Sequence, residues 1–239
     1  MSSWQDAFAQ QTRACRALGS VLTARVCDAL ARVIASDTGP VGQRVKSWPG
    51  DAGPGADSVP LRLCGALHAL TMTNRAPALT AAYAMAGGVQ LDLEIRSAIQ
   101  NNAPHFLEWL EYAPQTNEVG RSGPLIAVAW FLGARYPGVR FDLLELGGSA
   151  GLNLNFPHYS LANEMGFQPS LAEGELSEVR LAPLWRGTPP EPAPLAVGTA
   201  RGVDLNPLDP ARDGFRLMAY TWPDQRDRLG RLRAALAVA

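Results

Sequence analysis

The most informative stretch of the chain is Leu143-Leu144-Glu145-Leu146-Gly147-Gly148-Ser149-Ala150-Gly151-Leu152-Asn153. Its apolar first half, taken back to Arg140, predicts a central parallel strand that is covered on both faces. The small residues that follow predict a tight turn into a helix. Such a turn presents backbone N–H groups to a ligand, and the helix dipole favours negative groups there. Glu145 adds a carboxylate at the end of the strand, where ligands bind in open α/β sheets.

Two classes of cofactor fit a turn of this kind. A dinucleotide fold requires Gly-x-Gly-x-x-Gly, but counting from Gly147 places Ser149 and Leu152 at the second and third glycines, which disfavours an NAD(P)-dependent oxidoreductase. The acidic-x-Gly-x-x-x-Gly spacing of Glu145, Gly147 and Gly151 instead resembles the first motif of class I S-adenosylmethionine-dependent methyltransferases. This resemblance implies that the turn wraps the methionyl part of the cofactor, although Ser149 replaces the commonest glycine. The residues expected to bind are Glu145, Gly147, Gly148, Ser149, Ala150 and Gly151. The alternative is a tight turn that needs glycine for its backbone and binds nothing.

Composition limits the classes of protein that the chain can belong to. With 239 residues, of which 47% are hydrophobic, it is long and apolar enough to bury a full core. The formal net charge of −1 provides no basic field for nucleic acid. No segment has the unbroken apolar length of a membrane helix. The three cysteines, Cys15, Cys27 and Cys64, are widely spaced and suggest reduced core thiols, with neither a disulfide framework nor a metal site. Since the N-terminus has no secretion signal, we expect a cytoplasmic protein.

The first half of the chain reads as an all-helical module covering residues 1–113. Apolar stripes run through Trp4–Ile34 and are interrupted at Gly19, and a Gly- and Pro-rich loop is expected over Thr38–Asp57. Further helices are predicted at 60–73, 76–86, 91–100 and 104–112.

Residues 114–239 predict a partial Rossmann-like cofactor-binding domain with an insertion at 156–198. A helix over 125–136 leads to the strand at 140–146, and Gly202–Pro207 reads as a second strand. A hairpin is expected within the insertion, Glu178–Trp185 against Leu195–Ala200. Helices over 210–220 and from Asp224 onward close the chain.

Asp204 is the natural second half of the cofactor site. In doubly wound folds an acidic residue at the end of the second strand accepts hydrogen bonds from ribose hydroxyls. This assignment needs the insertion to lie between the two strands, because the separation from the turn is long. Asp204 is alternatively a turn or cap residue, since Asp-Leu-Asn-Pro is favourable turn sequence.

A polar run, Gln115–Ser122, precedes the helix that leads to the strand. That helix is roughly 20 Å long, which matches a six-residue strand, so its N-terminus lies at the same edge as the glycine turn. Asn117, Glu118 and Arg121 are therefore expected beside the ligand. Arg121 suits the methionyl carboxylate, and Glu118 suits the ammonium or a catalytic base. The alternative is an Arg–Glu pair and a Ser cap that hold the helical module in place.

Asp224 begins the last helix near the same edge and is a further catalytic candidate with Asn117 and Glu118. The simpler role for Asp224 is the N-cap of its own helix.

Six segments together resemble an uncharacterised bacterial family, a domain of unknown function. They are residues 60–63, 115–122, 145–153, 185–187, 202–209 and 222–225. The resemblance covers nearly the whole chain and implies no established activity. The resemblance implies that members of that family continue beyond the last residue of this chain. Either the later strands of the sheet are missing, or the family makes a smaller sheet whose exposed edge is covered by the helical module. An unprotected sheet edge would favour homo-oligomers.

We therefore expect an α/β fold, with an N-terminal helical module packed on a possibly incomplete methyltransferase-like core. The expected function is S-adenosylmethionine-dependent methyl transfer to an unknown small molecule. The alternatives are a non-catalytic cofactor-binding or interaction module and, less favoured, an NAD(P)-dependent oxidoreductase.

Overall fold

The computed structural model describes residues 3–85, 88–170 and 177–239. Contacts within the chain separate two units. Unit 1 contains Met1–Gln115 and Phe215–Arg226, and unit 2 contains Thr116–Gly214 and Asp227–Ala239. The first division falls close to the predicted boundary after residue 113. Phe215–Arg226, which the sequence placed with the second domain, belongs to unit 1.

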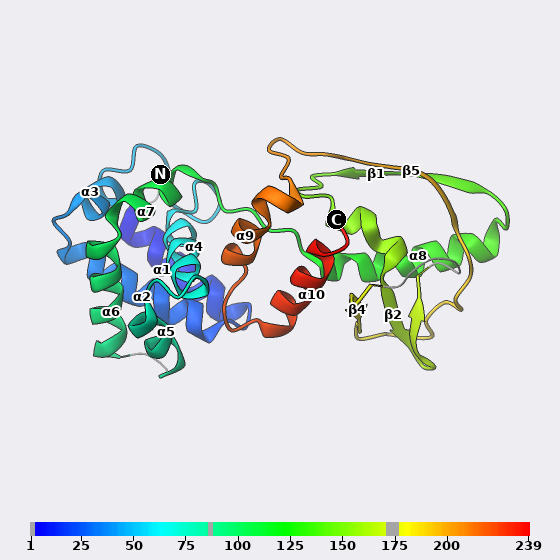
Figure 1. Ribbon diagram of the computed structural model, residues 1–239, viewed down its shortest axis with the longest axis horizontal. Helices are drawn as coiled ribbons and strands as arrows, with labels where there is room; N and C mark the ends of the chain where they lie inside the picture. Colours follow the sequence, from blue (N-terminus) through cyan, green and yellow to red (C-terminus); the bar gives the residue numbers. More distant parts are fainter. Residues whose placement is uncertain (1–2, 86–87, 171–176) are drawn as a thin grey trace. The chain divides into compact units, whose positions relative to one another are not determined.

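Unit 1 is built from helices; in Figure 1, α1 to α7 are drawn from blue to green and α9 in orange. They are α1 (Trp4–Ala17), α2 (Val21–Ser36), α3 (Pro40–Lys46), α4 (Val59–Met72), α5 (Pro77–Ala84), α6 (Val89–Asn101) and α7 (Ala103–Glu111), with the last residues of α9 (Pro210–Tyr220). The break at Gly19 is confirmed, and its φ of +83° explains why glycine separates α1 from α2. The short helix α3 was not predicted; it begins at a proline inside the predicted loop.

The core of unit 1 forms where the apolar stripes of these helices meet. Leu30, Leu63, Leu67 and Phe106 are among its fully buried side chains. All three cysteines are free and buried.

Unit 2 contains a parallel pair of strands, β1 (Arg140–Leu146) and β5 (Ala196–Val203), which run side by side in Figure 1. The 3-10 helix η1 (Val119–Arg121) and helix α8 (Ser122–Arg135) precede β1, and the 3-10 helix η2 (Leu152–His158) follows the glycine turn. A second sheet contains β2 (Ser160–Asn163), β3 (Gly166–Pro169) and β4 (Arg180–Leu181), and α10 (Arg226–Leu236) lies near the C-terminus.

The predicted hairpin is wrong, because residues 196–203 pair with β1. The reason lies in the glycines of β5: a Cβ at Gly198 would come within 2.5 Å of the Asp142 carboxylate on β1. That carboxylate accepts hydrogen bonds from both the backbone N and the hydroxyl of Thr199. Within the predicted hairpin's first arm, β4 instead pairs in parallel with β2.

The sequence predicted that β1 is covered on both faces, and this prediction is wrong. Leu144 and Leu146 are 69% and 77% exposed, whereas Phe141, Leu143 and Glu145 on the other face are half-buried. The first sheet has two strands in the described part of the chain, so a full Rossmann methyltransferase core is not shown. No helix among the described residues is long and apolar enough to cross a membrane.

Candidate functional site

The glycine turn connects β1 to η2 with an unusual backbone. Gly147, Ser149 and Gly151 have φ values of +71°, +53° and +70°. Glycine adopts this left-handed conformation without steric cost, whereas in Ser149 the same conformation is strained because its Cβ crowds the backbone. The element that follows is a 3-10 helix rather than the predicted α-helix, with Pro157 inside it. The turn therefore leads into a short 3-10 helix and does not open a long α-helix with a strong dipole.

The N–H groups of the turn are not free, which corrects the expectation that they face a ligand. Gly147 and Gly148 donate to the carbonyl oxygen of Val203 at 2.8 and 3.1 Å, and Gly151 donates to that of Gly148 at 2.7 Å. Ser149 N donates to the Asp204 carboxylate at 2.8 Å. Poorly solvated backbone donors need partners, and the protein supplies these itself.

Asn117 completes this pairing from the polar run before α8. Its Oδ1 accepts hydrogen bonds from Ala150 N at 3.2 Å and Leu152 N at 3.1 Å. The side chain is buried. Asn117 therefore lies at the turn, at the edge that the helix and strand lengths predicted. It orients the backbone, and its carboxamide oxygen is already used.

Asp204 follows β5 and lies beside the turn, because Leu146 and Val203 are paired across the two strands. One carboxylate oxygen accepts from Ser149 N and the other accepts from Asn206 N, at 2.9 Å. These backbone hydrogen bonds, that of Asn206 first, lower the pKa of Asp204. The place expected for a ribose-binding acid is thus occupied by an ionised carboxylate, and the ribose role stays a prediction.

Glu118 is already engaged by cationic partners. It caps η1 through Gly120 N at 3.0 Å, and it forms ion pairs with Arg228 and, at 4.0 Å, with Arg231 of α10. These contacts match the structural alternative of an Arg–Glu pair, but the arginines come from α10 and not from Arg121. A free catalytic base at Glu118 is therefore disfavoured.

Asp224 belongs to unit 1 and caps α2 instead of its own helix. Its two oxygens accept from Ser20 Oγ at 2.5 Å and from Leu22 N at 2.9 Å. The first turn of α2 has N–H groups without helical partners, and this carboxylate pairs with one of them. The N-cap prediction was therefore wrong about which helix is capped, and the contacts of Asp224 do not support a catalytic role.

Glu145 is held by a chain of buried polar side chains that the sequence analysis did not find. Asn153 Nδ2 donates to Glu145 Oε1 at 3.2 Å, and Ser122 Oγ donates to Asn153 Oδ1 at 2.8 Å. Ser122 and Asn153 are 0% and 3% exposed. A sequence signal for them exists: Ser122 stands at the start of the apolar segment before β1, and Asn153 stands among apolar residues just after the glycine turn.

The second oxygen of Glu145 is buried and has no hydrogen-bond partner among the described residues. An unpaired buried acceptor costs about 1–3 kcal/mol, and more when it is charged. Glu145 also lines a cavity of about 270 Å³ with Arg121, Asn153 and five apolar side chains. The apolar part consists of Leu125, Leu143, Leu144, Leu154 and Phe156.

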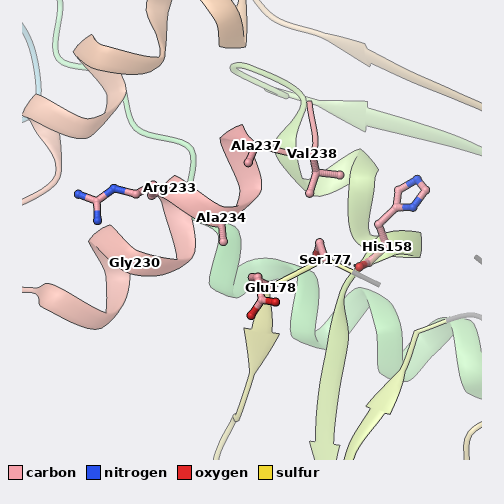
Figure 2. Close-up of a pocket in the computed structure, with 8 residues that line it drawn as sticks. All are labelled: His158, Ser177, Glu178, Gly230, Arg233, Ala234, Ala237 and Val238. Atoms are coloured by element: carbon pink, nitrogen blue, oxygen red, sulfur yellow. Dashed lines mark hydrogen bonds between the residues drawn. The ribbon is translucent and has the colours of Figure 1, made fainter. Parts of the chain in front are cut away.

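A larger cleft of about 730 Å³ lies against α10, and Figure 2 shows its lining. Gly230 and Ala234 of α10 form one side with Ala237, which follows this helix, and Ser177 Oγ donates to the His158 carbonyl oxygen at 2.8 Å. The His158 ring and the Arg233 guanidinium point away from each other in Figure 2. η2 separates His158 from the turn by roughly 14 Å at the rise of a 3-10 helix. The polar groups of this cleft do not converge, so the smaller cavity beside the turn is the better candidate site.

In the described ranges, no group of three or more His, Cys, Asp or Glu side chains is arranged to hold a metal.

Comparisons with known proteins place the chain in a family. No curated protein and no solved structure matches the chain. One family model matches residues 5–239, nearly the whole sequence. The chain therefore belongs to DUF2332, a family described as an uncharacterized protein conserved in bacteria.

Proposed function

We propose that unit 2 binds S-adenosylmethionine at the carboxyl ends of β1 and β5 and transfers its methyl group to a small molecule. One observation carries the proposal. Two adjacent parallel strands each carry an acidic residue next to their carboxyl end, Glu145 before the last residue of β1 and Asp204 directly after β5, and the positive-φ turn follows β1. Ligands of open α/β sheets bind outside the carboxyl ends of such strands.

The residues present fit a nucleoside ligand in two respects. Asp204 is ionised and only partly buried, and each carboxylate oxygen can accept more than the one backbone hydrogen bond that it has. It therefore retains acceptor capacity for ribose hydroxyls. Glu145 has an unpaired oxygen that a cationic group would satisfy.

The turn would contribute shape rather than hydrogen bonds, because its N–H groups are paired internally. S-adenosylmethionine, when bound, supplies a methyl group activated by its sulfonium. The protein would hold that group against the acceptor, and orientation alone accounts for a large part of the acceleration in such transfers. The contacts of Asn117, Glu118 and Asp224 provide no free base, so we assign no proton transfer to them.

The test is binding calorimetry with S-adenosylmethionine, S-adenosylhomocysteine and NADH. We expect the first two to bind and NADH not to bind. Asp204→Asn should weaken binding of both adenosyl ligands, because a neutral amide is a poorer acceptor for the ribose hydroxyls. Asp142→Asn is the matched control: Asp142 is an exposed carboxylate of the same sheet that also accepts a backbone N–H. Equal loss in both variants, or no binding of either adenosyl compound, would refute the proposal.

A second candidate, a non-catalytic interaction module, is favoured by the apolar surface of the strand pair. Leu144, Leu146, Val203 and Leu205 are all exposed, and exposed apolar patches of this kind commonly mark interaction surfaces. This candidate would be favoured if the chain binds no adenosyl ligand but still associates with another chain through this apolar surface.

A further inference from the structure

The cavity beside the turn carries opposite charges that are not paired with each other. Arg121 and Glu145 both line it. Within residues 3–85, 88–170 and 177–239, the Arg121 side chain makes no ion pair or hydrogen bond, and Glu145 Oε2 likewise has no partner. Two unpaired charges of opposite sign in one cavity suit a ligand that carries both complementary charges.

The Glu145 carboxylate is positioned before any ligand arrives. Ser122 holds Asn153, and Asn153 in turn holds Glu145 through its Oε1 atom, so that Glu145 Oε2 remains as the free acceptor. Side chains held by a second layer of hydrogen bonds are typical of built binding sites. Oε2 is closed off from solvent, so contact with a ligand requires a small rotation of the carboxylate towards the cavity that Glu145 already lines.

We infer that this cavity recognises an α-amino-acid group with an apolar chain. The ammonium would pair with Glu145, the carboxylate would pair with the Arg121 guanidinium, and the chain would pack against Leu125, Leu154 and Phe156. This assignment moves the ammonium from Glu118, which already has two arginine partners, to Glu145.

The size of the cavity supports a compact group. Its volume of about 270 Å³ is below that of sites for larger ligands, which measure roughly 300–1,000 Å³. The amino-acid group has two possible sources: a free apolar amino acid, or the amino-acid end of S-adenosylmethionine with the nucleoside outside the cavity. The second source rests on the proposed function, whereas the first does not.

The experiment is binding calorimetry on the full chain with four probes. They are L-methionine, 3-(methylthio)propylamine, adenosine and S-adenosylhomocysteine. L-Methionine is expected to bind, and 3-(methylthio)propylamine, which lacks the carboxylate, should bind at least about tenfold more weakly because Arg121 loses its partner.

Two substitutions test the charged groups. Glu145→Gln and Arg121→Gln should each weaken binding of L-methionine by about tenfold or more. Asp142→Asn on the exposed face of β1 and Arg135→Gln at the end of α8 are the matched controls and should leave binding unchanged. Leu125→Trp should abolish binding by filling the cavity from a half-exposed position, without removing a polar group.

The outcomes separate this inference from the proposed function. Binding of L-methionine that both charge variants weaken, without binding of S-adenosylhomocysteine, supports the amino-acid site and refutes the adenosyl cofactor. S-adenosylhomocysteine binding that neither variant changes overturns the amino-acid site and leaves the cofactor proposal standing. No binding of any probe, or binding of L-methionine that is insensitive to the variants, also overturns this inference.

Discussion

The two units bury their apolar residues to very different extents. In unit 1 the apolar stripes of the helices meet in one continuous buried cluster. In unit 2 the outer face of β1 and a stripe of α8, Leu125, Val128 and Phe131, are exposed. Helices with apolar stripes cover one another, whereas a two-stranded parallel pair cannot cover its own faces. One acidic residue of each unit differs in the same sense: both oxygens of Asp224 in unit 1 are paired, whereas Glu145 in unit 2 keeps one buried oxygen unpaired, although Asp204 of unit 2 has both of its oxygens paired. Unit 1 is organised for packing, and unit 2 retains groups that suit binding.

The sharpest test of this contrast compares one leucine from each unit. Leu67 of α4 is fully buried, and Leu67→Ala should lower the free energy of unfolding by about 2–5 kcal/mol, because it leaves a cavity. Leu146→Ala on exposed β1 should change it by less than about 0.5 kcal/mol. Urea unfolding followed by circular dichroism measures both. A comparable cost at Leu146 would mean that the outer face of the sheet is covered in solution.

The turn of unit 2 should depend on Asn117 for its stability. Asn117→Leu leaves the N–H groups of Ala150 and Leu152 without their acceptor, at a cost of about 1–3 kcal/mol for each buried group. Asn117→Asp retains an acceptor oxygen and should recover much of the loss. Hydrogen exchange at Ala150 and Leu152 provides a local readout. If the amides of Ala150 and Leu152 exchange as slowly in Asn117→Leu as in the original chain, the Asn117 side chain does not hold the turn.

Self-association should follow the exposed strand pair. Unpaired strand edges and exposed apolar side chains favour pairing with another chain, so we expect homo-oligomers at high concentration. Leu144→Ser with Leu146→Ser should raise the dissociation constant by at least about tenfold, because each side chain contributes roughly 1.5–3 kcal/mol when fully buried. Light scattering measures the change, and Leu18→Ser, also at an exposed leucine but in unit 1, is the control. A monomer at all concentrations would contradict this expectation.

The parts of the fold that could be predicted from sequence are those set by local signals. The helices of unit 1 follow from apolar spacing, from the break at Gly19 and from prolines at helix starts. The placement of Asn117 beside the turn followed from the similar lengths of α8 and β1. By contrast, β5 contains glycines that show no strand alternation, and the need for one of them, Gly198, is seen only in its close approach to Asp142 of β1.

The neighbourhood of the candidate residues could be predicted, but their hydrogen-bond partners could not. Glu145 and Asp204 were placed together because both lie at the carboxyl ends of predicted parallel strands, and Arg121 was placed by the N-terminus of the helix before β1; that they bind a ligand stays a prediction. The internal pairing of the turn could not be predicted, because a backbone N–H has no sequence signature for its acceptor. Similarly, Asp224 pairs with Ser20 across 204 residues of sequence, which no local pattern reveals.

Between pH 8 and 5, the pH dependence of stability should give the smallest effect and should come from the histidines of unit 1. His68 and His105 lie on helices of unit 1, and burial lowers the pKa of each below the ordinary value of 6.5. His68 Nδ1 lies 3.0 Å from the Ala219 carbonyl oxygen, so the neutral ring donates there. Because the folded pKa is lowered, the unfolded chain takes up the proton first as the pH falls. The stabilisation is therefore complete above about pH 7 and declines as the pH falls through 6.5 towards the folded pKa.

Melting temperatures between pH 8 and 5 should show this decline, and His68→Gln should flatten it. Leu67→Val, which destabilises the same helix without removing a titrating group, should lower the curve and keep its slope. If His68→Gln leaves the slope unchanged, the buried imidazole is not the source of the pH dependence.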